Sequence, residues 1–206
     1  MADTTFDSTA YWTRRYRKGG NSGAGSYGRL AEFKADFLNQ FLTMHQIETL
    51  FDLGCGDGNQ LSKIKPRNYI GFDVSENSLA RCRKRFAGVP QFLFMHISEI
   101  DTIEQKSDLS ISMDVVFHLI EDEIFSKYME RLMDSSSKYV ILYASDWEGA
   151  APAPHVKHRW FSRWIALHRP EWIVTSRLAN PFPFDPSDPD NSSFADFCVC
   201  THRDLL

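Results

Sequence analysis

The strongest constraint on the fold is a short apolar run that leads directly into a glycine-rich turn, FDLGCGDGNQL at residues 51–61. The run Thr49–Leu53 predicts a buried strand. Gly54, Gly56 and Gly58 follow it at alternate positions, and glycine lets a backbone adopt unusual dihedrals and approach a ligand closely. A strand that ends in such a turn and opens a helix is typical of α/β proteins that bind nucleotide-like ligands.

The spacing of these glycines differs from that of phosphate-binding loops. The dinucleotide fingerprint requires glycine at its sixth position, where this chain has Asn59, and no Walker-type lysine motif is present. Asp52 lies inside the end of the strand, where its carboxylate can fix the turn or face an ammonium group. Asp73 closes the next predicted strand, where a carboxylate suits the two hydroxyls of a ribose. The pattern therefore predicts a nucleoside ligand with a free ribose, and not clearly a diphosphate.

Strands and helices alternate along the rest of the chain. The apolar patterns predict strands at 49–53, 69–72, 91–95, 109–113 and 139–143, and helices at 30–44, 60–64, 75–86 and 121–133. Single crossover helices imply a parallel sheet. Two last predicted strands, 172–178 and 194–200, are joined by a segment without a helical pattern, so we expect them to be antiparallel. The expected fold is α/β, a doubly wound, mostly parallel seven-stranded sheet with a terminal antiparallel strand.

Composition narrows the class of protein. The 206 residues fit one domain, which we expect to divide into an N-terminal helical lid with a glycine-rich loop at 1–45 and a core at 46–206. A net charge of −4 gives no global field for a polyanion, so nucleic acid is not expected as a partner. No apolar run approaches the roughly 18 residues that span a bilayer, and no secretory signal is evident, so we expect a cytoplasmic protein without a membrane partner. A monomer and a homodimer both remain open.

The segments DLGCGDG and GFDVS resemble motif I and the following acidic motif of the class I S-adenosylmethionine-dependent methyltransferases. The resemblance covers about residues 50–143 by motif and the end of the chain by topology. It implies S-adenosylmethionine as cofactor and a Rossmann-like sheet that ends in an antiparallel hairpin. The segments YWTRRYRKGGNSGAGSYGRLAEFKA, HVKHRWFSRW and NPFPFDPSDPDNSSFADF further resemble a subset associated with bacterial surface-glycan and modified-peptide pathways.

The resemblance also implies roles for individual residues of this chain. The glycine turn with its Cys55 makes room for the methionine part of the donor, and Asp52 lies beneath it. Asp73 holds the ribose, and Val74 packs on the adenine. The third strand of the family normally ends in an acidic residue near the adenine amine, but His96 stands there, so the backbone amide of Ile97 is expected to serve instead. Two further residues, Met113 and Asp114, match the position near the sulfonium and the acceptor.

The aromatic and basic N-terminal segment is a second candidate element of the donor site. Trp12, Arg15, Tyr16 and Tyr27 flank the glycine-rich stretch. We expect this segment to close over the donor, because a lid excludes water and aromatic faces attract a sulfonium cation. A helix that only covers the sheet is the alternative interpretation.

Methyl transfer is an in-line displacement, so alignment supplies much of its rate. A hydroxyl acceptor also needs a base, whereas a carboxylate acceptor is already ionised at neutral pH. His118, His155 and His158 are the candidate bases, and Arg159 could hold an anionic acceptor. Helix capping for His118 and solvent exposure for the other three are the alternatives. No metal is expected, because the His-x-x-His pair lacks a third ligand at useful spacing.

The function expected from the sequence is therefore that of an S-adenosylmethionine-dependent methyltransferase. We expect O-methylation of a small or peptide acceptor, either a sugar hydroxyl or a peptide carboxylate. A non-catalytic donor-binding module and a nicotinamide-dependent oxidoreductase are the alternatives. The missing sixth-position glycine and the terminal antiparallel pair argue against the oxidoreductase.

Overall fold

The computed structural model describes residues 6–151 and 153–206. Seven strands form one sheet: β1 (Thr49–Leu53), β2 (Asn68–Asp73), β3 (Phe92–His96), β4 (Ser107–Met113), β5 (Ser136–Ala144), β6 (Trp172–Leu178) and β7 (Asp196–His202). Five α-helices accompany them: α1 (Ser8–Arg17), α2 (Gly28–Met44), α3 (Glu76–Arg85), α4 (Asp122–Asp134) and α5 (Phe161–His168).

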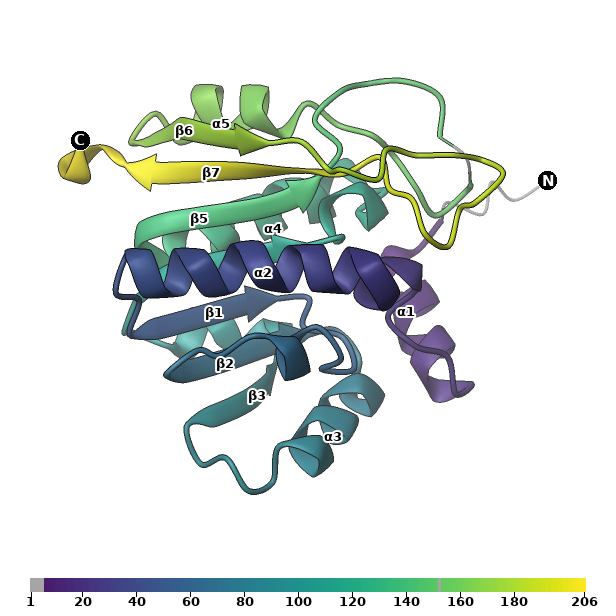
Figure 1. Cartoon of the computed structure of the whole chain (residues 1–206), viewed down its shortest axis with the longest axis horizontal. Coiled ribbons are helices and arrows are strands. Elements are labelled where there is room, and N and C mark those ends of the chain that lie inside the picture. The colour runs from purple at the N-terminus through teal and green to yellow at the C-terminus, as the bar shows by residue number, and fades with distance from the viewer. Residues whose placement is uncertain (1–5, 152) are drawn as a thin grey trace.

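The strand order across the sheet is β3-β2-β1-β4-β5-β7-β6. Strands β1 to β5 are parallel, whereas β7 lies between β5 and β6 and is antiparallel to both. The expected doubly wound sheet with its terminal antiparallel strand is confirmed. In Figure 1 the parallel strands point toward α1, so their carboxyl ends lie on the side of the sheet where the N-terminal segment is found.

Two connections differ from the sequence prediction. The helix expected at 60–64 is only a 3-10 turn at Leu61–Lys63, because Pro66 leaves too few residues for an α-helix. Helix α5 was not predicted, since eight residues with buried Phe161 and Ile165 give little helical periodicity. Ser75 caps the start of α3, because its side chain accepts a hydrogen bond from the Ser78 amide.

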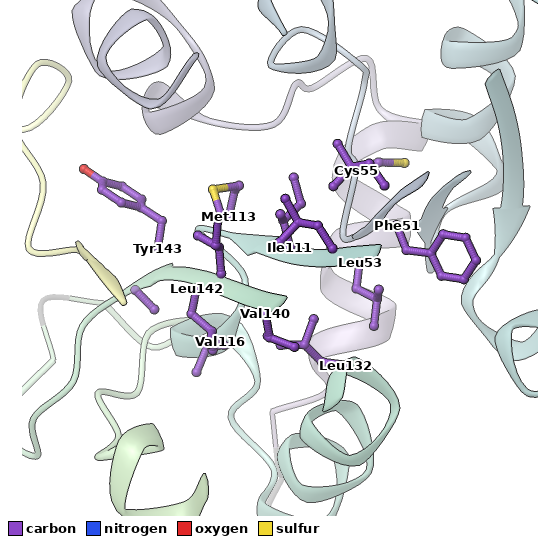
Figure 2. Packing of buried hydrophobic residues seen from close by; sticks show 14 of the residues in the cluster. Phe51, Leu53, Cys55, Ile111, Met113, Val116, Leu132, Val140, Leu142 and Tyr143 are labelled. Atoms are coloured by element: carbon purple, nitrogen blue, oxygen red, sulfur yellow. The ribbon is translucent and has the colours of Figure 1, made fainter. Parts of the chain in front are cut away.

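Helices cover both faces of the sheet. Helix α2 crosses the front face and α4 lies behind it (Figure 1). Figure 2 shows that neighbouring residues of one strand, such as Leu142 and Tyr143, point to opposite faces, so the interior strands are buried on both sides. Tyr128 of α4 joins the layers, because its buried hydroxyl donates to the Leu53 carbonyl at 2.6 Å and lies 2.6 Å from Ser112 Oγ. No helix in the described ranges is long and apolar enough to cross a membrane.

Candidate functional site

One pocket opens at the carboxyl ends of β1, β2 and β4, and the N-terminal segment closes its other side. Pockets at this edge of a parallel sheet are the usual ligand sites of α/β folds. Its walls come from four parts of the chain: Trp12, Tyr16, Ser22 and Ser26; Asp52, Gly54, Cys55, Gly56 and Gln60; Asp73, Val74 and Ile97; Met113, Asp114, Val115, His118, Leu119 and Tyr128. Of the residues expected at the donor, Gly58 lies outside these walls and packs behind the turn against Phe86 and Cys82, and Arg15 and Tyr27 of the N-terminal segment lie outside them as well.

The glycine turn needs its glycines for two separate reasons. Gly54 has φ +95 and Gly56 has φ +60, both in the region that side chains disfavour. A Cβ on Gly56 would also lie 2.2 Å from Ser22 Oγ, so the N-terminal loop rests directly on this position. The backbone amides of Gly54 and Cys55 both donate to the Phe72 carbonyl, at 2.7 and 2.9 Å, which ties the turn to β2.

Asp52 is a buried carboxylate with a hydrogen-bond partner on only one of its two oxygens. Its Oδ2 accepts a hydrogen bond from the Tyr69 hydroxyl at 2.8 Å. Its Oδ1 is buried and has no hydrogen-bond partner among the residues that the structure describes. Burial raises the pKa of Asp52 from its usual 3.8 to about 7. The Gln60 side-chain oxygen is a second buried acceptor without a partner in the described chain, and it lines the same pocket.

Asp73 lies at the end of β2 with both carboxylate oxygens held by backbone amides. Oδ2 accepts from Gly56 at 3.0 Å and Oδ1 from Ser75 at 2.9 Å. Burial raises the pKa of this carboxyl, and the hydrogen bonds from Ser75 and Gly56 oppose that shift. Each oxygen keeps a lone pair that can accept a further bond from a ligand hydroxyl.

The far end of the pocket is formed by Val74 and Ile97, which follow β2 and β3. His96, where the family pattern has an acidic residue, caps the 3-10 turn at Ile97–Thr102. Its Nδ1 lies 2.7 Å from Ser98 Oγ and its Nε2 3.2 Å from the Val74 carbonyl. His96 therefore stabilises the two loops that form the wall.

The N-terminal segment is fastened to the glycine turn through Asp57. The Asp57 carboxylate accepts hydrogen bonds from the Tyr27 hydroxyl at 2.8 Å and the Ser22 amide at 3.2 Å, and its own amide donates to Ser22 Oγ at 3.0 Å. Tyr16 is 3 % exposed, and its hydroxyl lies 2.9 Å from Ser22 Oγ. Arg81 of α3 donates to the Tyr16 carbonyl at 3.0 Å, so α1 is also tied to the core. Sequence reasoning missed Asp57 and Arg81.

His118 is the candidate base that lines the pocket. Its Nδ1 lies 2.7 Å from the His155 carbonyl oxygen. Because a carbonyl oxygen only accepts, Nδ1 carries the proton and Nε2 keeps a lone pair. Burial lowers the pKa of His118 from 6.5 to about 4, so the ring is neutral at physiological pH. The Trp12 ring packs edge-on against it at 4.8 Å.

The other three candidates lie outside the pocket walls. His155 stacks on Tyr11 at 5.0 Å. His158 is buried, with Nδ1 2.8 Å from Ser145 Oγ and its ring 3.8 Å from that of Trp147. His155 and His158 both lie in the connection between β5 and α5.

Arg159 has most of its guanidinium occupied by the protein itself. It donates to the carbonyls of Leu119 and Ile120, at 2.9 and 2.8 Å through NH2, and to the Asp122 carboxylate at 2.6 Å. These bonds fix the loop that carries His118. No group of three or more His, Cys, Asp or Glu residues in the described chain is arranged to hold a metal ion.

A buried lysine at the edge of the pocket is a further residue that the sequence patterns did not reveal. Lys34 lies on the inner face of α2, and its Nζ forms an ion pair with Asp114 Oδ2 at the edge of the pocket. A lysine at a core-facing position of an amphipathic helix was the only sequence signal available.

Comparison with known proteins agrees with this geometry. Residues 50–136, somewhat less than half of the chain, match the family model of a methyltransferase domain. No curated protein sequence matches the chain. Among solved structures, magnesium protoporphyrin IX methyltransferase from Synechocystis PCC 6803 with bound S-adenosylmethionine is similar, with TM-score 0.68 and 15% identity over 98% of this chain and 100% of that one.

Two further structures show the same likeness. The N-methyltransferase NodS from Bradyrhizobium japonicum WM9, in complex with S-adenosyl-L-homocysteine, has TM-score 0.72 and 12% identity over 95% of this chain and 99% of that one. The methyltransferase domain of bacterial CtHen1 has TM-score 0.62 and 17% identity over 83% and 97%. The class I methyltransferase fold is confirmed, and S-adenosylmethionine is the cofactor of the matched domain. The match favours a methyltransferase over a nicotinamide-dependent oxidoreductase.

Proposed function

We propose that this chain is an S-adenosylmethionine-dependent methyltransferase that methylates an oxygen atom of a small or peptide acceptor. The observation that carries the proposal is the convergence, in one pocket, of the glycine turn, the Asp73 carboxylate and the unpartnered Oδ1 of Asp52. Buried polar atoms without partners are rare in folded proteins, so two of them in one pocket indicate a ligand that supplies hydrogen-bond donors.

The residues present fit the donor from end to end. An ammonium group carries three donors, so the methionine end can satisfy both Asp52 Oδ1 and the Gln60 side-chain oxygen. Asp73 would accept from the ribose hydroxyls, and Val74 and Ile97 would pack against the adenine. When bound, S-adenosylmethionine supplies a methyl carbon already activated by the adjacent sulfonium. The protein therefore has to position the acceptor and, for a hydroxyl, receive its proton.

We assign proton acceptance to Nε2 of His118 rather than to His155 or His158. His118 lines the pocket, its tautomer is set by the His155 carbonyl, and its low pKa keeps it neutral. Arg159 would act indirectly, by holding the loop before α4 in place. The N-terminal segment would act as a lid, because its closure over the pocket depends on contacts with Asp57 that can be broken without unfolding the sheet.

The acceptor class proposed from the sequence is a sugar hydroxyl or a peptide carboxylate, in a surface-glycan or modified-peptide pathway. The N-terminal and C-terminal segments that resemble this subset border the pocket or the loops beyond it. Arg29 of the N-terminal segment, for example, donates to the Asn191 carbonyl of the C-terminal one at 2.7 Å.

Calorimetric titration with S-adenosylmethionine and S-adenosylhomocysteine tests the donor site. Asp73→Ala removes the carboxylate that would bind the ribose, and hydrogen bonds to a charged group contribute about 1.5–3 kcal/mol each, so affinity should fall roughly tenfold to a hundredfold. Asp36→Ala makes the same chemical change at an exposed position of α2 and should bind like the parent. Equal affinity of parent and Asp73→Ala would contradict the proposal. Transfer of labelled methyl into a metabolite extract separates an enzyme from a non-catalytic binding module.

A further inference from the structure

The pair formed by Lys34 and Asp114 is unusual for its burial. The Lys34 side chain is 0% exposed and that of Asp114 is 15% exposed. The Lys34 ammonium also lies 5.1 Å from the centre of the Tyr143 ring. A buried ammonium requires an anionic partner, and the pair fixes the Asp114 carboxylate against α2 at the wall of the pocket.

The backbone of Asp114 also adopts an uncommon conformation. Its φ is +58, and Gln46 is the only other non-glycine residue with positive φ in the described chain. The Asp114 amide donates to the Tyr143 carbonyl at 2.9 Å, which holds the residue in place at the end of β4. Left-handed non-glycine residues concentrate at functional sites, where the surrounding structure enforces them.

The charged side chains in the pocket walls are all carboxylates. Asp52, Asp73 and Asp114 contribute three carboxylates to the pocket walls, and none of the described residues in those walls is Lys or Arg. Lys34 lies behind Asp114 and is already paired with it. Asp52 and Asp73 would face the donor, so an acceptor carboxylate would meet the Asp114 carboxylate in a site of reduced dielectric, with no Lys or Arg among the described wall residues to offset the repulsion.

On the basis of the methyltransferase function proposed above, we infer that the acceptor is an uncharged compound that bears hydroxyl groups, and that Asp114, positioned by Lys34, is the residue that selects it. One hydroxyl donates a hydrogen bond to Asp114 and orients the acceptor. The oxygen of the reacting hydroxyl forms a bond to the methyl carbon as the carbon–sulfur bond breaks, and that electron pair stays on sulfur. The hydroxyl proton passes to Nε2 of His118. The site thus favours a hydroxyl over the peptide carboxylate that the sequence left open.

The chemical form of the labelled product tests this inference even while the acceptor itself is unidentified. The protein is incubated with methyl-labelled S-adenosylmethionine and a small-molecule and peptide extract, and the products are then treated with mild alkali. Methyl esters release volatile labelled methanol, whereas methyl ethers keep the label, and mass spectrometry distinguishes ethers from methylamines. Label retained as ether is the expected result, and label released as methanol or found on nitrogen would overturn the inference. A protein that binds the donor but labels nothing would instead overturn the methyltransferase proposal, and the inference with it.

Variants at the pair test the role of Asp114 itself. Asp114→Asn removes the charge, and asparagine tolerates the left-handed backbone. Because this change leaves the Lys34 ammonium buried without an anion, the double variant Lys34→Met with Asp114→Asn removes both charges, a replacement that folded proteins commonly accept. With the acceptor that the labelled product identifies, both variants should raise the acceptor KM at least tenfold while the calorimetric donor Kd changes less than threefold. Asp36→Asn is the matched control. An unchanged acceptor KM in the folded double variant would refute the assignment.

Discussion

Replacement of Asp52 by asparagine tests the electrostatics of the donor site and does not require the acceptor to be identified. Asparagine keeps the size of the side chain and an oxygen for the Tyr69 hydroxyl, and it removes the titrating proton. Burial raises the pKa of Asp52 from 3.8 to about 7. At ~1.4 kcal/mol per pH unit, this difference corresponds to about 4 kcal/mol.

The sign of the effect follows from proton binding. Between about pH 4 and pH 7 the folded protein holds a proton on Asp52 that the unfolded chain has lost. The free energy of unfolding therefore falls as pH rises through this window, and the loss is complete above the raised pKa. Asp73, whose pKa is also raised, contributes a slope in both proteins, so the difference between parent and variant reports Asp52 together with its repulsion of Asp73.

Urea unfolding of the unliganded proteins at pH 5 and pH 8 measures this difference. The parent should lose stability between the two pH values, and Asp52→Asn should lose less, so that at pH 8 the variant is the more stable protein by up to ~4 kcal/mol. Its affinity for S-adenosylmethionine should nevertheless fall roughly tenfold to a hundredfold, because a charged acceptor for the ammonium group is gone. Parallel pH dependence in parent and variant, or undiminished donor affinity, would refute the reasoning. The exposed Asp36→Asn serves as control.

Three further predictions concern the lid, the core and the base. Gly56→Ala should displace the loop at Ser22, whose Oγ would lie 2.2 Å from the added Cβ, and should weaken donor binding at least roughly tenfold. The left-handed backbone should in addition lower the free energy of unfolding by about 1–2 kcal/mol. Gly88→Ala, with no atom near its added Cβ, is the control, and undiminished donor affinity by calorimetry or unchanged hydrogen exchange across α1 would contradict the prediction. Tyr128→Phe removes both hydrogen bonds of a buried hydroxyl and should lower the free energy of unfolding by about 1–3 kcal/mol in urea. Because the pKa of His118 is lowered to about 4, kcat at saturating donor should be insensitive to the titration of this residue above pH 5, and a rise near pH 6.5 that disappears in His118→Gln would show that the ring is not buried as described.

The sequence predicted the sheet well for a physical reason. Interior parallel strands are buried on both faces, so they appear as continuous apolar runs, and the strand at 49–53 was predicted with its observed bounds. The 3-10 turns and α5 were missed because they are too short to develop a hydrophobic period. Elements with a long apolar run or a clear hydrophobic period could therefore be predicted, and shorter ones could not.

The candidate site divides in the same way. The glycine turn and Asp73 follow strand ends that the sequence shows directly, whereas Lys34 and Asp114 are 80 positions apart and meet only in the folded chain. A lysine on an amphipathic helix is normally exposed, so the core-facing position of Lys34 alone did not indicate its partner. Asp57 was hidden for another reason: it sits between two motif glycines, and its hydrogen bonds reach a loop whose position no periodicity could indicate.

The attachment of the loop after α1 to the glycine turn has a kinetic consequence. The loop that would cover the donor rests on Gly56 and is held by Asp57, so exchange of spent S-adenosylhomocysteine for fresh donor requires those contacts to break first. Opening would then be a compulsory event in every cycle, and its frequency would set a ceiling on turnover that faster chemistry could not exceed. A slow-release enzyme of this kind shows a burst of one methylated product per active site before it settles to its steady rate.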